Sequence, residues 1–166
     1  MDNKEELLNK LKHLEEDFNT QVTNIKKQIE EYDKKAFEPK LGEEYYLILR
    51  TGKVNMYEFS NDNTDKKLIN FGNYFKTKEE AERKSFEIKL HRQLELFALE
   101  NNDREIDWGD GSEKYIIIYR IDVGILINKV YSSKYFGQVY FTSKEIAEKA
   151  IETFKYDLIR YFTSNK

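Results

Sequence analysis

The stretch YFKTKEEAE at residues 74–82 returns almost unchanged as YFTSKEIAE at residues 140–148. In both copies an aromatic pair is followed by a hydroxyl residue, Thr77 or Ser143, and then by a charged run that favours a helix. Ser and Thr are preferred N-cap residues because the side-chain oxygen accepts a hydrogen bond from a free backbone N–H of the first helical turn. Each copy therefore predicts the end of a strand followed by the start of a helix.

The two predicted helix starts differ in one detail. Thr77 and Glu80 have the spacing of a capping box, in which each side chain accepts a hydrogen bond from the backbone of the other residue. The second copy has an apolar residue at the equivalent position, so it must use Ser143 alone or Thr142 with Glu145. We expect both helices to be capped, the first by two reciprocal bonds.

A longer repeat surrounds these two phrases. In each half, two runs rich in β-branched and aromatic residues are separated by a Gly turn, and a third run opens at Phe-Gly. The runs are EYYLILR (44–50), TGKVNMYEF (51–59) and NFGNYF (70–75), then KYIIIYR (114–120), DVGILINKVY (122–131) and YFGQVYF (135–141). Such runs between turn residues are typical of strands. The sequence thus predicts an α+β fold with two tandem β-β-β-α modules, residues 44–101 and 114–166, each with an antiparallel sheet.

The helix that closes each module has its own apolar pattern. The second helix has one apolar face, formed at spacings of three and four by Ala147, Ile151, Phe154, Leu158 and Phe162. The first helix, residues 77–100, is apolar around more of its circumference, so we expect it to lie centrally, between its own sheet, the other module and the long N-terminal helix. At Ala81 and Ala147 each helix should first touch its sheet. Modules of about 55 residues are marginally stable alone, so we expect the two to pack together.

Residues 1–36 predict one long amphipathic helix, because no Gly or Pro interrupts them. Its apolar residues follow one stripe: Leu7, Leu11, Leu14, Phe18, Val22, Ile25, Ile29 and Tyr32. Such a helix spans roughly 50 Å, more than one small domain can cover, so the stripe must meet another helix. We expect a coiled-coil-like homodimer through these residues; the alternative is that the helix folds back on its own domain. Residues 37–43, which hold the only Pro, are expected to form a linker.

Two polar segments lie within and between the modules. Residues 60–67, SNDNTDKK, are expected to form an exposed loop in the first module. Residues 102–113 form an acidic connector, whose candidate partner-binding residues are Asp103, Glu105, Asp107, Trp108 and Asp110. The carboxylates lack the ligand spacing of a calcium loop. They are therefore either turn residues or an acidic surface for a binding partner.

The composition excludes several classes of site. The chain has no Cys, which rules out disulfides and thiolate metal sites. His13 and His91 lack metal-ligand spacing, and no phosphate-loop or zinc-protease motif occurs. The apolar runs are too short to cross a bilayer, and the first residues lack the apolar core of a signal peptide. We therefore expect a cytoplasmic, non-enzymatic protein with no membrane partner and no catalytic, cofactor-binding or metal-binding residues.

Charge is distributed unevenly along the chain. The formal net charge is -3, but residues 41–113 have an acidic excess and residues 114–166 a basic one. Nucleic-acid binding depends largely on Lys and Arg placed against phosphates. The alternative to protein binding is therefore a nucleic-acid site on the second module, with Arg120, Lys129 and Lys134 as its candidate residues.

The junction of strand, cap and KEEAE resembles the three-strand-plus-helix DNA-binding modules of phage integrase arms and plant AP2-type factors. Those modules read DNA with their sheet, through Arg and Lys residues on the strands. Here that basic run is missing, and Arg50, Lys53, Arg120 and Lys129 are scattered over the strands and their turns.

A second resemblance covers residues 37–119. The segments FEPKLGEEYYLI, NDNTDKK, FGNYFKTKEEAE, LELFALENND, IDW and KYIIIY are similar to small proteins encoded in phages and prophages of low-GC Gram-positive bacteria. That group typically has no assigned activity, has an aromatic residue, usually Trp, in the place of Phe37, and starts with a shorter N-terminal segment. The resemblance implies an accessory phage gene, and such genes often encode inhibitors of host defence, including CRISPR nucleases.

Three functional hypotheses follow. The first is a non-enzymatic phage-type protein that inhibits a host defence protein, such as a CRISPR nuclease, by covering its surface in the host cytoplasm. Its acidic residues 41–113 would compete for a basic nucleic-acid channel. The second is a nucleic-acid-binding protein that uses the more basic second module. The third is a structural or assembly protein that uses only the coiled-coil helix.

Overall fold

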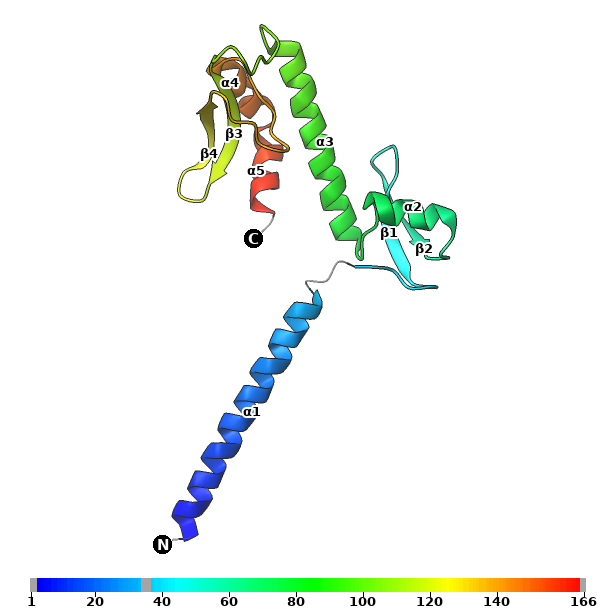
Figure 1. The fold of residues 1–166 in the computed structure, drawn as a ribbon, viewed down its shortest axis with the longest axis vertical. Helices are drawn as coiled ribbons and strands as arrows, with labels where there is room; N and C mark the ends of the chain where they lie inside the picture. The colour runs from blue at the N-terminus through cyan, green and yellow to red at the C-terminus, as the bar shows by residue number, and fades with distance from the viewer. Residues whose placement is uncertain (1–2, 34–36, 165–166) are drawn as a thin grey trace. The chain divides into compact units, whose positions relative to one another are not determined.

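The computed structural model describes residues 3–33 and 37–164, with side chains for residues 9–26 and 37–164 (Figure 1). Within these residues the chain forms five helices and four strands: α1 (Asn3–Asp33), β1 (Glu44–Ile48), β2 (Val54–Glu58), α2 (Asn63–Phe71), α3 (Lys78–Asn101), β3 (Lys114–Arg120), β4 (Gly124–Val130), α4 (Lys144–Thr153) and α5 (Lys155–Thr163). The predicted α+β class is confirmed. The chain separates into two units, residues 1–40 and 41–166, whose boundary falls inside the predicted linker, residues 37–43. Each unit is described by itself.

Helix α1 forms the first unit, and the prediction of one long N-terminal helix is confirmed. The structure describes the side chains of Leu11, Leu14, Phe18, Val22 and Ile25; those of Leu7, Ile29 and Tyr32 lie outside the described residues. Apart from Val22, which is half-buried, these apolar side chains are between 54% and 67% exposed within the chain. No helix in the described part of the chain is both long and apolar enough to span a lipid bilayer.

Each module contains a two-stranded antiparallel hairpin, β1–β2 or β3–β4, in place of the predicted three-stranded sheet. The third strand is reduced to a single bridge, in which the two backbones exchange both hydrogen bonds. The bridges join Tyr46 to Phe75, with N–O distances of 2.9 and 2.8 Å, and Tyr115 to Phe141, both at 2.9 Å. The prediction of a third strand is therefore wrong. Its Phe-Gly segments turn instead, with positive φ angles of 77° at Gly72 and 74° at Gly137.

Helix α2 replaces the exposed loop predicted at residues 60–67. Asp62 caps it with a capping box, accepting from the backbone N–H groups of Thr64 and Asp65. The Asp65 side chain points inward and is buried, accepting hydrogen bonds from the Tyr45 hydroxyl at 2.7 Å and from the Ser60 backbone at 2.8 Å. A polar run therefore forms a helix here because its carboxylates are used inside the module.

The bridges also correct the alignment of the two halves. Phe75 and Phe141 are equivalent in the repeated phrase, so their partners Tyr46 and Tyr115 are equivalent as well. By similarity alone Tyr45 would be matched with Tyr115. A shift of one residue exchanges the two faces of a strand. The true equivalent of Tyr45 is thus Lys114, and both side chains are almost fully buried, at 2% and 1% exposure.

Helix α3 lies between the two hairpins, and it packs against both modules (Figure 1). Its capping box of Thr77 and Glu80 forms as predicted, and Ala81 is fully buried on the first module. Farther along, Leu90 and Ala98 join the core of the second module. The expected position of this helix between its own sheet and the other module is confirmed. Its buried apolar residues contact different modules at its two ends, whereas Ile88, Leu96 and Leu99 are exposed.

The helix predicted at the end of the second module is divided into α4 and α5. They meet at Phe154, whose backbone (φ -107°, ψ 18°) leaves the helical range. Ser143 alone caps α4, accepting from the backbone N–H of Ile146 at 3.2 Å. The predicted apolar face is retained, with Ala147 and Leu158 buried in the core around Phe141.

The hydrogen bond between the buried Tyr45 and Asp65 should stabilise the fold, so removal of the Tyr45 hydroxyl should measurably lower the free energy of unfolding. Burial alone would raise the pKa of Asp65, but hydrogen bonds from Tyr45 and Ser60 outweigh it and lower the pKa below its usual value. A hydrogen bond to a charged group contributes more than one between neutral groups. We expect Tyr45→Phe to lower the free energy of unfolding by about 1.5–3 kcal/mol at neutral pH, measured by urea denaturation.

The same variant has a defined pH dependence. Because the folded-state pKa of Asp65 is lowered, its stabilisation is present above the pKa of the unfolded chain and disappears as the pH falls through the folded-state value. The difference between wild type and Tyr45→Phe should therefore shrink in acid. Tyr46→Phe is the matched control, because no hydrogen bond of the Tyr46 hydroxyl is found within the described residues. Equal losses in both variants at neutral pH would contradict the assignment.

Candidate binding site

The connector between α3 and β3 is folded by its own acidic residues. The Asp107 carboxylate accepts a hydrogen bond from the Gly109 backbone at 2.8 Å, and the Asp110 carboxylate accepts one from the Ser112 backbone at 2.8 Å. Such turns are the usual local role of Asp. Two of the five predicted partner-binding residues therefore hold the connector in shape.

Lys114 is the buried centre around which this connector folds. Its ammonium donates to the Asp110 carboxylate at 2.9 Å and to the Ser112 carbonyl at 3.0 Å. The hydrogen bond from Lys114, together with that from Ser112, holds the pKa of Asp110 well below its usual range. The ammonium also lies 5.4 Å from the centre of the Trp108 ring. Trp108 is thereby fixed against the second module.

Trp108 lies against a second aromatic ring and a second cation. The Tyr140 ring meets it edge-to-face, with 4.8 Å between the ring centres. The Lys134 ammonium lies 4.9 Å from the centre of the Trp108 ring, a cation–π distance. Asn102 ties the connector to the same strand-like segment: its amide donates to the Tyr140 carbonyl at 3.1 Å and accepts from the Thr142 backbone at 3.0 Å.

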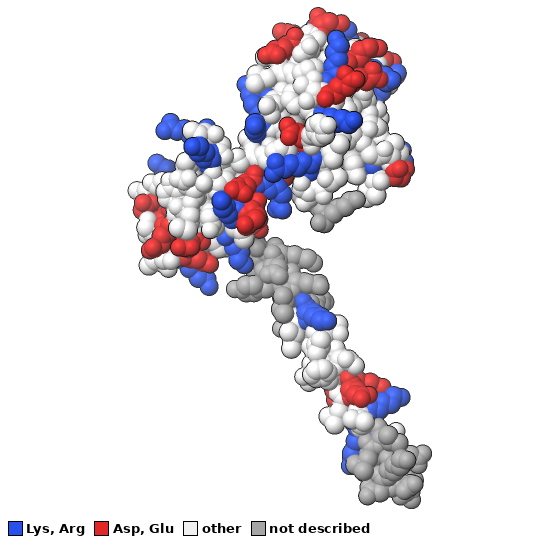
Figure 2. Space-filling view, turned by 180° about the vertical axis from the view of Figure 1, so that it is seen from behind, with Lys and Arg blue, Asp and Glu red and all other residues white. Residues whose placement is uncertain are grey.

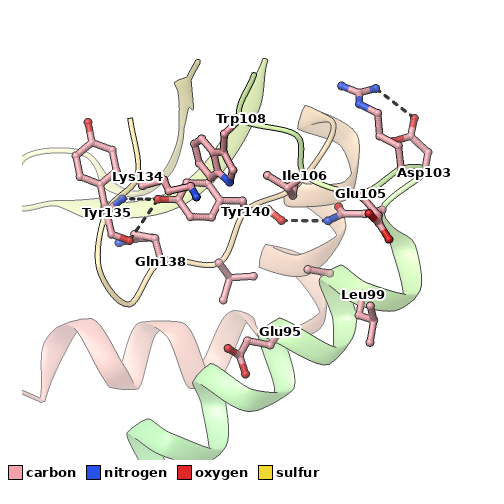
Figure 3. Close-up of a pocket in the computed structure, with 14 residues that line it drawn as sticks. Glu95, Leu99, Asp103, Glu105, Ile106, Trp108, Lys134, Tyr135, Gln138 and Tyr140 are labelled. Atoms are coloured by element: carbon pink, nitrogen blue, oxygen red, sulfur yellow. Dashed lines mark hydrogen bonds and ion pairs between the residues drawn. The ribbon is translucent and has the colours of Figure 1, made fainter. Parts of the chain in front are cut away.

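These residues border a pocket with a volume of about 640 Å³, which we call the connector pocket (Figure 3). Its apolar part is formed by Leu99 of α3, Ile106 and Trp108 of the connector, and Val139 and Tyr140. Leu99 is 79% exposed, so its side chain is accessible to a bound molecule. The volume lies in the range of ligand-binding pockets.

Ionisable residues are placed along the rim of the connector pocket. Glu95 pairs with Arg92 at 3.1 Å, and Asp103 lies 3.8 Å from Arg104. A hydrogen bond from the Thr142 side chain, and then the Arg104 charge, lowers the pKa of Asp103. Two lining charges differ from these. Lys134 and Glu105 have no ion-pair partner within the part of the chain that the structure describes.

The two unpaired charges lie at opposite ends of the pocket. Figure 3 shows Lys134 near Tyr135 at one end and Glu105 near Asp103 at the other, with Trp108 and Ile106 between them. Three of the five predicted partner-binding residues, Asp103, Glu105 and Trp108, thus line one pocket. Lys134, predicted as a nucleic-acid contact, joins them.

The other two predicted nucleic-acid contacts are matched by carboxylates. Arg120 pairs with Asp122 at 2.7 Å, and Lys129 pairs with Glu113 at 2.8 Å. The hydrogen bond with Glu113 raises the pKa of Lys129, and the same bond lowers the pKa of Glu113. On the face seen in Figure 2, basic and acidic side chains alternate, and no continuous basic stripe is seen. These local pairs reduce the positive field available to phosphates.

Sequence reasoning identified Trp108 and the carboxylates of the connector but missed most of the pocket's apolar wall. Leu99 comes from α3, and Val139 and Tyr140 come from the bridge segment about 40 residues later, so only the packing of that segment against α3 brings them together. Lys114 was also missed, although a signal existed. Lys114 opens the apolar run YIIIY two residues after Ser112 of the Gly-Ser turn.

The site suits binding by shape, aromatic surface and charge. Among the described side chains, no three His, Asp or Glu residues gather where they could hold a metal ion. His91 lies 3.0 Å from the Gly137 carbonyl and His13 lies 3.8 Å from Glu16, positions typical of surface histidines. The chain matches no protein-family model, no curated protein and no solved structure, so its function must be argued from this pocket and from α1.

Proposed function

We propose that this chain is a non-enzymatic, homodimeric protein-binding protein, whose partner docks at the connector pocket. The observation that carries the proposal is the pocket itself, in which half-buried apolar and aromatic side chains and the exposed Leu99 lie between charges that lack ion-pair partners in the described residues. Interfaces are enriched in Trp and Tyr, and their strongest contacts cluster in such desolvated positions. Trp108 is already held in place, so little conformational freedom is lost when a partner binds.

The exposed stripe of α1 supports the homodimer. Leu11, Phe18 and Ile25 are seven residues apart, and Leu14 occupies the intervening coiled-coil position. This spacing fits a second copy of the same helix, because each apolar residue then packs into a hole formed by the partner helix. Gln21, at the same type of position as Leu14, would meet its own copy and pair amide to amide.

The resemblance of residues 37–119 to phage accessory proteins supports a finer hypothesis. The partner would be a host defence protein, such as a CRISPR nuclease, which the dimer inhibits by covering its surface in the bacterial cytoplasm. Nucleic-acid binding is the second candidate, favoured by the contact between Lys134 and Trp108, since a cation beside an aromatic face also suits single-stranded nucleic acid. An assembly role of α1 alone is the third.

A capture experiment with two matched variants tests the protein-binding function. Leu99→Glu places a charge in the connector pocket, whereas Ile121→Glu makes the same change at an exposed turn residue between β3 and β4. We expect wild type and Ile121→Glu to retain the same protein from a bacterial lysate, and Leu99→Glu to lose it. Binding that is equal in all three would contradict the pocket as the docking site.

The same protein samples distinguish nucleic-acid binding from protein binding. Retention on heparin that weakens with added salt would favour nucleic acid, because phosphate contacts release counterions. We expect weak retention of the wild type, since Arg120 and Lys129 are already paired. Strong, salt-sensitive retention that is lost in Lys134→Glu would replace the protein-binding proposal.

A further inference from the structure

The unpaired charges of the connector pocket indicate what kind of segment it takes. We propose that it binds an extended peptide segment of the partner in which an aliphatic or aromatic side chain lies between one acidic and one basic residue. The acidic side chain contacts Lys134, the basic one contacts Glu105, and the apolar side chain packs on Trp108 and Leu99. This inference rests on the protein-binding function proposed above.

The apolar centre of the pocket selects the middle of the segment. Figure 3 shows Ile106 and the Trp108 ring between the two charged ends, with Leu99 across from them on α3, and Val139 also lines the pocket. An aliphatic or aromatic side chain placed there removes apolar surface from water on both sides, which is the main favourable term in such contacts. A charged or amide side chain at the same place would lose its hydration without a hydrogen-bonding partner.

The charges at the two ends of the connector pocket determine which charges the bound peptide must carry. Lys134 donates up to three hydrogen bonds, and within the described residues its ammonium lies over the Trp108 ring and has no ion-pair partner, so a carboxylate there gains charge-assisted bonds. Glu105 offers the opposite end a carboxylate for an ammonium or guanidinium group. Segments with two acidic or two basic residues gain one of these contacts and suffer repulsion at the other.

The remaining charges favour a peptide over a nucleic-acid strand. Glu95, Asp103 and Glu105 all line the pocket, while Arg104 is engaged by Asp103. With Glu95 and Asp103 matched by Arg92 and Arg104, a chain of phosphates crossing this rim would gain one contact at Lys134 and be repelled at Glu105. A peptide backbone is uncharged, so it meets no such repulsion.

The only Trp of the chain, Trp108, reports binding through its own fluorescence. The probes are four blocked tetrapeptides with two central Leu residues and Asp or Lys at each end, added up to about 1 mM. Two of these peptides have one Asp end and one Lys end, in the two possible orders, so that both directions of the bound peptide are tested. We expect one mixed-charge peptide to bind at least about tenfold more tightly than the two like-charged peptides.

Two charge reversals then test the assignment of each end. Lys134→Glu should come to prefer the peptide with two Lys ends, and Glu105→Lys the one with two Asp ends. Lys155→Glu and Glu152→Lys are the matched controls, because they change the net charge equally at exposed sites on α5 and α4. These controls should keep the preference of the wild type.

Several results would overturn the inference. They are unchanged Trp108 emission with all four peptides, an unaltered preference in both reversed variants, or displacement of the peptides by a single-stranded oligonucleotide. If the peptides fail but Leu99→Glu still loses the captured protein, the ligand class is wrong and the protein-binding function stands. If both experiments fail, the docking site itself is wrong.

Discussion

We expect Leu11→Asp combined with Phe18→Asp to convert a dimeric protein into a monomer of 20.0 kDa. Both side chains are more than half exposed in the single chain and lie on the same stripe of α1. In a coiled coil they would be buried against the partner, where two carboxylates from each helix would face each other without counterions. The cost of desolvating these charges exceeds what the shortened stripe can supply. Sedimentation equilibrium measures the mass directly.

The control for this variant adds the same two negative charges to the same helix. Asn9→Asp combined with Thr23→Asp adds two negative charges to the opposite face of α1, and both residues are exposed. It should remain a dimer at the same protein concentration. A wild type that sediments as a monomer would refute the coiled-coil proposal. So would a Leu11→Asp, Phe18→Asp variant that stays dimeric.

The second large effect concerns the core of the second module. Phe141 is fully buried, its ring lies 6.5 Å from that of Phe97, and its backbone makes the bridge to Tyr115. We expect Phe141→Ala to lower the free energy of unfolding by about 3–5 kcal/mol, because the change combines lost burial with a cavity that the packed neighbours cannot fill. Urea denaturation followed by Trp108 fluorescence reports on this module specifically, since Trp108 contacts the adjacent Tyr140.

A matched control lies five residues earlier. Phe136 occupies the turn before the bridge segment and is fully exposed to solvent. Phe136→Ala removes the same atoms and should change the free energy of unfolding by no more than about 0.5 kcal/mol. If both variants unfolded alike, the core would not be organised around Phe141.

The sequence predicted the features that depend on neighbours close in the chain. The caps at Thr77 and Ser143, the small residues at Ala81 and Ala147 and the long α1 all follow from local hydrogen bonds and periodicity. Similar local patterns identified the acidic connector and its Trp108. These signals are strong because they need no knowledge of what packs against them.

The features that failed depend on long-range packing. Whether NFGNYF pairs over several residues or only at Phe75 is decided by where Gly72 turns the chain, and a strand-like composition does not show this. The equivalence of Tyr45 with Lys114 was hidden because similarity scores align Tyr with Tyr. Only the bridges to the repeated Phe residues reveal the offset.

The shared helix α3 makes the duplicated halves of the sequence inseparable in the molecule. Its first turns cover one hairpin, and its last turns supply Leu90 and Ala98 to the other core. A cut anywhere inside this helix would expose apolar surface of one module. Removal of the second module would leave Leu90 and Ala98 exposed to water. We therefore expect neither half of the chain to fold when it is expressed without α3.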